Sequence, residues 1–217
     1  MDPLAATLDA ICVQVFGKIS AAISHDLKNV LAIVNENAGL VDDLALRAAK
    51  GIEIPPDRLT VTTARILKQV KRGDAVLKNL NRFAHSTDVP LSQVNVAEMV
   101  ALMVDLAGRQ AAMKELTFTV APSEVVVSTC VVYLESLVYL LLRQLIDTVP
   151  RKETVEITVA VDGDAVMISA ENGAGLPLLE GNAVDGEQER SLMQWLQAEV
   201  SVVPGKMELR LPQQGAL

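Results

Sequence analysis

One uninterrupted helical pattern dominates the first quarter of the chain. No proline occurs between Leu4 and Lys50, and apolar or small side chains recur at helical spacing along this stretch. A helix of this length spans roughly 65 Å at about 1.5 Å per residue, far more than a compact domain of this size needs. The chain must therefore fold around an elongated element. The apolar stripe consists of Leu8, Cys12, Val15, Ile19, Ala22, Val30, Ile33, Val41 and Leu44.

A second helical pattern follows a short break. The segment GIEIPP at 51–56 ends the first helix and lets another begin, since proline is tolerated in a first turn. Two amphipathic helices joined by a short turn form an antiparallel hairpin, whose apolar side one hairpin alone cannot cover. We expect a homodimeric four-helix bundle over residues 1–88; the alternative is that the rest of the same chain covers this side. The second stripe consists of Leu59, Thr63, Ile66, Val70, Leu77, Leu80 and Ala84.

Residues 89–217 show a mixed pattern, which predicts an α+β sandwich as a second domain. The stretch 86–95 reads as a linker, and Asn95 with Glu98 is typical of a capped helix start. The Asp162-Gly163 pair between two alternating segments predicts a β-hairpin. The other expected elements are helices from Asn95 toward Met113, over 131–149 and over 190–197, and strands over 116–120, 125–128, 199–203 and 207–211, with a loop over 172–186.

Composition excludes several function classes. Half of the 217 residues are hydrophobic but only 3% are aromatic, so the core must be aliphatic. Met99, Met103 and Met113 are expected in it, with an adaptable contact surface as the alternative. A formal charge of −8 is the wrong sign for a nucleic-acid partner. The longest charge-free stretch, 125–134, is about half of what a bilayer requires, and the acidic start does not resemble an export signal. We therefore expect no membrane association and a cytoplasmic location.

Of the two cysteines and the two histidines, one histidine has the surroundings of a functional residue. Cys12 and Cys130 lie far apart without metal-ligand spacing, which indicates neither a disulfide framework nor a zinc site. His85 falls where the second helix should end, and a structural role beside the C-terminal dipole explains it. His25 lies in the middle of the first helix and is the candidate for chemistry.

The neighbours of His25 are those that a nucleophilic imidazole needs. Lys28 and Asn29 share its helical face at i+3 and i+4, while Asp26 lies about 100° round the helix. A carboxylate can hydrogen-bond one ring nitrogen and fix the tautomer that leaves the other nitrogen free as a nucleophile. Lys28 can offset the charge of a phosphoryl group. The alternative is a solvated histidine without a function.

The string SHDLKNVLAIV resembles the His-box of the two-component histidine kinases, and RGDAVLKNLNRFAHS resembles the end of the second helix of their dimerisation domain. The resemblance implies that His25 accepts the phosphoryl group, that Asp26 activates it, and that Asn29 takes part in transfer or phosphatase chemistry. Together with the composition, it predicts an α+β protein in which a dimeric helical hairpin precedes an ATPase-like sandwich.

The second half resembles the ATP-binding domain of the same kinases in a degenerate form. Gln144 stands where the family has an asparagine that helps hold magnesium and phosphates, and Glu171 stands where an aspartate binds adenine. The glycines of ENGAGLP remain, with an ordinary explanation as turn formers. The following loop offers acids where a polyphosphate needs amide donors and cations. Its acids, Glu180, Asp185, Glu187 and Glu189, are expected to be solvated, and we expect neither a bound nucleotide nor a bound metal.

These features resemble the ChpT-type histidine phosphotransferases, which keep the kinase architecture without autophosphorylation. The resemblance implies that His25 passes a phosphoryl group between the aspartates of response-regulator receiver domains, with Mg²⁺ supplied by the receiver. Three alternatives remain open. The first is a divergent sensor kinase that uses Gln144 and Glu171 to bind ATP. The second is a phosphatase in which Asn29 orients water. The third is a dimeric scaffold that binds response regulators without chemistry.

Overall fold

The computed structural model describes residues 3–89, 91–173, 186–203 and 205–213. Its contacts divide the chain into two units, one made of Met1–Ile19 with Arg82–Leu217 and one made of Ser20–Asn81. The first helix thus contributes to both units. The boundary at residue 88 that the sequence suggests between two domains stays a prediction.

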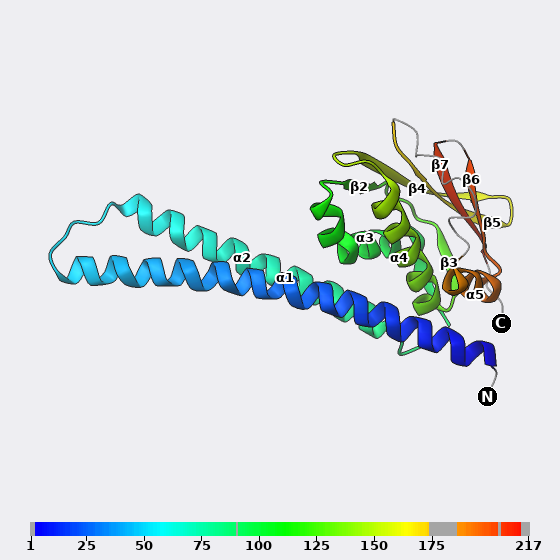
Figure 1. Ribbon diagram of the computed structural model, residues 1–217, viewed down its shortest axis with the longest axis horizontal. Helices are drawn as coiled ribbons and strands as arrows, with labels where there is room; N and C mark the ends of the chain where they lie inside the picture. Colours follow the sequence, from blue (N-terminus) through cyan, green and yellow to red (C-terminus); the bar gives the residue numbers. More distant parts are fainter. Residues whose placement is uncertain (1–2, 90, 174–185, 204, 214–217) are drawn as a thin grey trace. The chain divides into compact units, whose positions relative to one another are not determined.

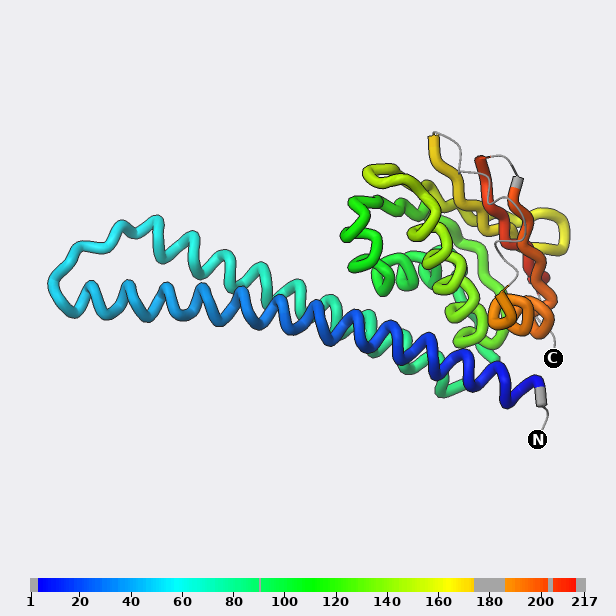
Figure 2. Tube along the Cα trace, in the orientation of Figure 1, coloured from blue at the N-terminus to red at the C-terminus, as the bar shows by residue number. Residues whose placement is uncertain are grey.

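The smaller unit is an antiparallel helical hairpin. It contains most of α1 (Pro3–Ala49) and of α2 (Pro56–His85), which confirms the two helices predicted from periodicity. Lys50 and Gly51 form the turn after α1, and Gly51 has a φ of 74°, a conformation that favours glycine. The helices lie side by side and diverge toward this turn (Figure 2).

The buried residues of α1 in the hairpin follow a seven-residue repeat. They are Val30, Asn37 and Leu44, whereas Thr62 and Gly73, which are buried on α2, lie eleven residues apart. Gly73 allows a close approach of the two helices, since a Cβ at this position would lie 3.3 Å from a methyl carbon of Val30, a tight contact. Spacings of seven and of eleven residues both return to nearly the same face of a helix.

The larger unit is built on a five-stranded mixed sheet in the order β2-β4-β5-β7-β6 (Figure 1). Only β2 and β4 pair in parallel; the other neighbours are antiparallel. The strands are β2 (Thr117–Val120), β4 (Thr154–Asp162), β5 (Ala165–Glu171), β6 (Glu199–Val203) and β7 (Lys206–Pro212). In the predicted hairpin, Asp162 pairs with Ala165, so Gly163 and Asp164 form the turn and Gly163 takes a φ of 63°.

Two helices cover one face of this sheet (Figure 1). They are α3 (Val96–Met113) and α4 (Val131–Thr148), and the core between helices and sheet is aliphatic, as the composition predicts. Val100 and Leu142 from the helices and Ile157, Ile168 and Leu209 from the strands line the same small space between the two layers. Each fully buried side chain of this kind contributes roughly 1.5–3 kcal/mol to folding.

The beginning of α3 confirms the cap predicted from the sequence. The Asn95 side chain accepts a hydrogen bond of 3.0 Å from the backbone N–H of Glu98, which satisfies one of the free amides of the first turn. The predicted linker over 86–95 is wrong in its last four residues. Ser92–Asn95 forms β1, which pairs antiparallel with β3 (Val126–Thr129), a partner more than thirty residues away.

The first turns of α1 belong to the core of the larger unit. Leu8, Val15 and Ile19 are fully buried. Tyr133 of α4 donates a hydrogen bond to Asp9, and Gln188 of α5 (Glu187–Leu196) donates one to Gln14. The N-terminal end of the long helix is therefore held by α4 and α5.

Methionine positions divide between core and surface. Met99 and Met103 are buried, as predicted. Met113 is 67% exposed, so its prediction as a core residue is wrong, because it is the last residue of α3 and lies beyond the part of the helix that faces the sheet.

By length and composition, one helix in the described residues could cross a membrane. It is the Leu4–Ala49 part of α1, with a window of mean hydropathy 1.4 that is one third buried. Core helices of soluble proteins and signal sequences meet the same criteria, so this finding leaves the predicted location untested.

Candidate functional site

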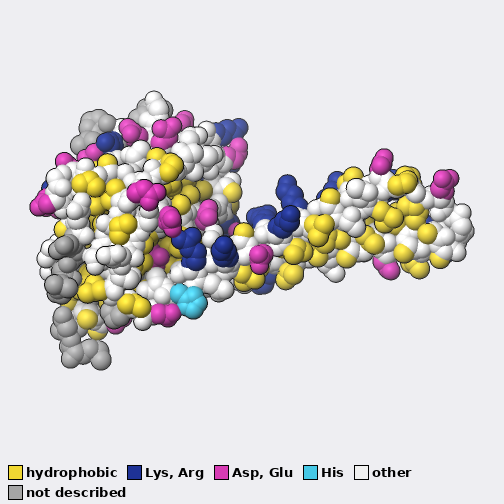
Figure 3. Space-filling view, turned by 180° about the vertical axis from the view of Figure 1, so that it is seen from behind, with side chains coloured by type: hydrophobic (Ala, Val, Ile, Leu, Met, Phe, Trp, Pro, Cys, Tyr) yellow, Lys and Arg dark blue, Asp and Glu magenta, His cyan; other side chains and the backbone are white. Residues whose placement is uncertain are grey.

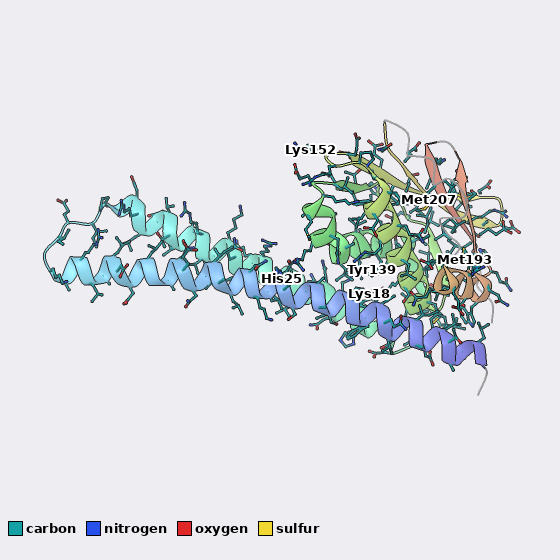
Figure 4. The ribbon with its side chains drawn as sticks, in the orientation of Figure 1. Lys18, His25, Tyr139, Lys152, Met193 and Met207 are labelled. Carbon is teal, nitrogen blue, oxygen red and sulfur yellow. The ribbon has the colours of Figure 1, made fainter. Side chains whose placement is uncertain are left out.

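The four residues singled out in the sequence all lie on one turn of α1, within the hairpin unit. His25, Lys28 and Asn29 are exposed, and Asp26 is half-buried. Figure 4 labels His25 on α1. The imidazole is therefore open to a macromolecular partner, as a phosphoryl carrier requires.

The face of α1 that carries His25 points away from α2. The residues of α1 in contact with α2 include Val30, Asn37 and Leu44, which are one heptad apart. At 100° per residue, His25 lies roughly 120° from Asn37, the middle of this contact stripe. The separation explains why an apolar helix leaves a histidine in solvent at its centre.

Asn29 is the hydrogen-bond partner of the imidazole. Its Nδ2 lies 3.1 Å from Nδ1 of His25, across one helical turn. With Nδ2 facing the ring, Nδ1 accepts and the ring proton is on Nε2; with the amide reversed, Nδ1–H donates to Oδ1 and the Nε2 lone pair is free. The second arrangement is the nucleophilic one, and the same contact distance accommodates it.

The backbone of α1 offers no donors for a bound phosphoryl group at this point. The amides of a helix interior are paired within the helix, and His25 is more than twenty residues from either end of α1. Lys28, one turn away, is the nearby cation. Further donors and any metal must come from a partner.

The second candidate region, in the ATPase-like unit, is occupied by a side-chain pair. Gln144 of α4 donates a 3.0 Å hydrogen bond from Nε2 to Oε1 of Glu189 at the start of α5. The Glu189 carboxylate lies so close to Gly186, the N-cap residue of α5, that a Cβ there would collide with it. Glu189 is 8% exposed, so the prediction that this acid is solvated is wrong.

The rest of the predicted loop divides between described and undescribed residues. Glu187 is exposed, and Glu171, the last residue of β5, is exposed as well. Glu180, Asp185 and the glycine at 175 lie outside the described residues. Asn172 is buried, and neither polar atom of its side chain has a hydrogen-bond partner among the described residues.

His85 behaves as the sequence suggests for the end of α2. Its Nδ1 lies 2.8 Å from the Asp88 carboxylate, in an exposed i,i+3 pair. The local partner accounts for this histidine without a role in chemistry.

One buried titratable residue, Glu135, lies near the end of α2 and was not predicted from the sequence. Glu135 of α4 is 3% exposed, and its burial raises its pKa to about 7, although the nearby Ser86 and Arg82 lower it. Its position in an apolar helix at core spacing could have drawn attention to it, but the partners are fifty residues away in the sequence.

No protein-family model matches this chain. The chain is 29% identical to sensor protein CreC of Escherichia coli (strain K12) over 183 residues, which cover 80% of this chain and 37% of that protein. The chain thus aligns with little more than a third of the length of this relative.

A solved histidine kinase shares the fold of this chain. Histidine kinase AdeS of Acinetobacter baumannii matches with a TM-score of 0.50 at 10% identity, covering 87% of this chain and 98% of that chain. The catalytic domain of histidine kinase ThkA matches with a TM-score of 0.48 at 12% identity, covering 59% of this chain and 100% of that chain. The chain has a long helix followed by a histidine-kinase ATPase-like domain, and it is a homologue of a sensor protein.

Proposed function

We propose that the chain is a histidine phosphotransferase of a two-component phosphorelay, in which His25 carries a phosphoryl group between receiver-domain aspartates. The observation that carries the proposal is the exposed imidazole of His25 with the Asn29 amide at its Nδ1. An imidazole held from one nitrogen presents the other to a partner in a defined direction.

The transfer step needs only this imidazole and a phosphorylated partner. The Nε2 lone pair attacks the phosphorus of the aspartyl phosphate, a P–N bond forms, and the P–O bond to the aspartate breaks, with the electron pair leaving on the carboxylate. The Nδ1 proton stays hydrogen-bonded to the Asn29 oxygen. In the second transfer, the aspartate of another receiver attacks, the P–N bond breaks, and the imidazole recovers its electron pair.

Most of the catalysis then comes from positioning and charge neutralisation. Asp26 and Lys28 flank the imidazole on α1, and we assign them activation of the ring and neutralisation of phosphoryl charge. The receiver supplies Mg²⁺ and the backbone donors that α1 lacks. We infer that this chain binds no nucleotide or metal of its own.

The Gln144–Glu189 pair supports independence from ATP. Nucleotide phosphates that approached Gln144 would also approach the buried Glu189 carboxylate, because Oε1 of Glu189 lies 3.0 Å from Nε2 of Gln144. Two like charges in a partly buried site repel strongly, because little water screens them. A kinase function would require this carboxylate to move or to be protonated.

The surface of the hairpin supports a homodimer. Leu59, Val70 and Leu77 of α2 and Leu31 of α1 are between 40% and 65% exposed. They lie on one side of the α1–α2 contact, and Figure 3 shows hydrophobic side chains at the surface of the hairpin. A second copy that packs the same side against this one would bury them in a four-helix bundle.

A second candidate function is an ATP-dependent sensor kinase, which the 29% identity to sensor protein CreC favours. A single pair of labelling experiments separates the two. The purified chain is incubated with ³²P-labelled receiver domains, and separately with γ-³²P ATP. A phosphotransferase takes label from a receiver and none from ATP, whereas a kinase labels itself from ATP.

The variants His25→Ala and His85→Ala serve as test and control in the same assay. We expect His25→Ala to abolish labelling and His85→Ala to leave it unchanged. Label that persists in the His25 variant contradicts the proposal. Stable receiver binding without any transfer identifies a scaffold, and loss of receiver phosphate without label on the chain identifies a phosphatase.

A further inference from the structure

The end of α2 is closed by the side chain of Ser86. Its Oγ donates a hydrogen bond of 2.7 Å to the backbone carbonyl of Phe83, and its backbone N–H lies 3.3 Å from the same carbonyl oxygen. The last carbonyls of a helix have no partner within the helix, so a side chain that donates to one of them stabilises the helix end. The Ser86 hydroxyl therefore holds the last turn of α2 in place.

The carboxyl group of Glu135 lies against this helix end. Glu135 belongs to α4 and is 3% exposed, and the Ser86 hydroxyl is close enough to form a hydrogen bond with it. Oε2 of Glu135 has no hydrogen-bond partner in the described residues. A carboxylate needs several donors to offset the hydration that it loses on burial. This position therefore favours the neutral carboxyl.

The one hydroxyl proton of Ser86 cannot serve both of its neighbours. While Ser86 donates this proton to the Phe83 carbonyl, its Oγ has only lone pairs to offer to Glu135. Such an oxygen accepts a hydrogen bond from a protonated carboxyl but gives none to a carboxylate. An ionised Glu135 would take the Ser86 proton away from the Phe83 carbonyl. The protonation of Glu135 and the closure of α2 are thus coupled through one hydroxyl group.

Arg82, one turn before Ser86 on α2, is the cation near Glu135. Its guanidinium group lies 3.7 Å from the carboxylate of Glu98 in the first turn of α3, and the two side chains are 49% and 71% exposed. An ion pair as exposed as this contributes little to stability. An ionised Glu135 would therefore compete with Glu98 for Arg82.

The other titratable neighbours of Glu135 supply no positive charge. The thiols of Cys12 on α1 and Cys130 at the start of α4 are close enough to respond to its charge, and burial raises the pKa of Cys12 to about 11 and that of Cys130 above its usual range. Asp9 lies near the same two thiols. Tyr139, one turn further along α4, is fully buried. None of these groups stabilises a carboxylate at this position.

We propose that Ser86 and Glu135 form a proton-sensitive catch, which holds the end of α2 while the carboxyl is protonated and opens when it ionises. In the closed form, the Glu135 O–H donates to Oγ of Ser86, and the Ser86 O–H donates to the Phe83 carbonyl. Once the proton is lost, Ser86 and Arg82 turn toward the carboxylate, and the last turn of α2 loosens. The catch is independent of the role proposed for His25.

The pH range of the catch follows from the burial of Glu135. Burial raises its pKa to about 7, against an ordinary value near 4.5. Because the closed form binds the proton more tightly, closure is favoured at low pH and is lost as the pH rises through about 7. Phe83 is 1% exposed and stacks on Phe16 of α1, with ring centroids 5.9 Å apart. This apolar contact does not titrate, so the opening stays confined to the end of α2.

The test measures amide hydrogen exchange of the full chain at pH 6 and pH 8, corrected for the intrinsic pH dependence of exchange. The reporters are the amides of Ser86, Thr87 and Asp88, each bonded to the carbonyl three residues earlier. We expect their protection to fall by about five- to tenfold from pH 6 to pH 8, the shift of a proton-linked equilibrium whose closed form has a pKa of about 7. Glu124→Gln, which changes an exposed acid, should behave like the unchanged chain.

Two variants separate the carboxyl from the hydroxyl. Glu135→Gln cannot ionise, and its amide donates to Oγ of Ser86 as the protonated carboxyl does. Its protection should be the same at both pH values, to within about twofold. Ser86→Ala removes the hydroxyl that couples the two events. We expect this variant to protect the amides of Thr87 and Asp88 weakly at pH 6 and to show little further loss at pH 8.

His85 is a second titratable side chain at the same helix end, where it bonds to Asp88, so a third variant tests it. In His85→Ala, the pH response of the Ser86 and Thr87 amides should persist. A response that persists in Glu135→Gln or disappears in His85→Ala would overturn the proposal, as would equal protection of the unchanged chain at both pH values. An equal loss of protection in the central strands β4 and β5 would identify global unfolding and would also overturn it.

Discussion

The side-chain amide of Asn29 lies 3.1 Å from Nδ1 of His25, one turn along the exposed face of α1. A hydrogen bond of this kind couples the ring tautomer to the orientation of the amide and sets the direction in which the other ring nitrogen points. The predicted role of Asp26 as the group that orients the ring remains untested beside this contact. One change at this contact and three changes elsewhere in the chain test the main structural conclusions.

Replacing Asn29 by alanine should slow phosphoryl transfer to His25 by about ten- to a hundredfold, because the ring loses its defined tautomer and direction. Receiver binding should stay unchanged, since the amide contacts the imidazole. Rates of label uptake from a phosphorylated receiver measure the effect. The control is Asn35→Ala, which removes another exposed amide of α1, and an equal loss in both variants would contradict an orienting role.

Replacing Val70 by glutamate should convert the proposed homodimer into a monomer. A carboxylate without a partner in an apolar interface costs roughly 3–5 kcal/mol. Sedimentation equilibrium gives the mass of the species in solution. Val61→Glu is the matched control, because Val61 is equally exposed but lies on the other side of α2. A dimer that survives the change at Val70, or dissociates equally with both changes, refutes the proposed interface.

Glu135 should make the folded protein less stable as the pH rises. Its carboxyl ionises near pH 4.5 in the unfolded chain, whereas burial raises its pKa to about 7 in the folded chain. The folded state therefore holds the proton more tightly, so the contribution of Glu135 to stability is fully present below about pH 4.5 and is lost as the pH rises through about 7, by an amount on the order of 3 kcal/mol.

The variant Glu135→Gln cannot ionise and should lose this dependence. At pH 8 it should have a higher free energy of unfolding in urea than the unchanged chain, whereas near pH 5 the difference should shrink. Glu124→Gln, at an exposed position, should follow the unchanged chain. Parallel pH profiles for Glu135→Gln and the unchanged chain would show that Glu135 ionises normally.

Replacing Glu189 by alanine should lower the free energy of unfolding by roughly 1–3 kcal/mol, because the change leaves the partly buried Gln144 amide without its acceptor. Thermal and urea denaturation measure the loss. The exposed Glu187, two residues earlier on α5, provides the control Glu187→Ala, for which little change is expected. Similar stability of the two variants would contradict a structural role for the pair.

The parts of this protein that were predictable depend on nearby residues. The two long helices follow from apolar periodicity, and the capped start of α3 follows from Asn95 and Glu98, three residues apart. The exposure of His25 follows as well, since it lies off the apolar stripe of its own helix. Each of these patterns involves residues that lie within about one helical turn of one another in the sequence.

Other parts depend on residues distant in the chain. The strand β1 was missed because its partner is β3, and four residues are too few to show alternation. Glu189 was expected in solvent because its partner, Gln144, is 45 residues away. The contact of Glu135 with the end of α2 joins residues that no single stretch of sequence brings together.

By itself the sequence determined the helical hairpin, the aliphatic core and the position of a solvent-exposed histidine, because helix periodicity and capping act between residues a few positions apart. Only the tertiary structure decided the order of the strands, the burial of Glu135 and Glu189, and the contact of Glu135 with the end of α2. The physical reason is that burial and electrostatic pairing depend on distance in space, and the packing of the whole chain sets that distance.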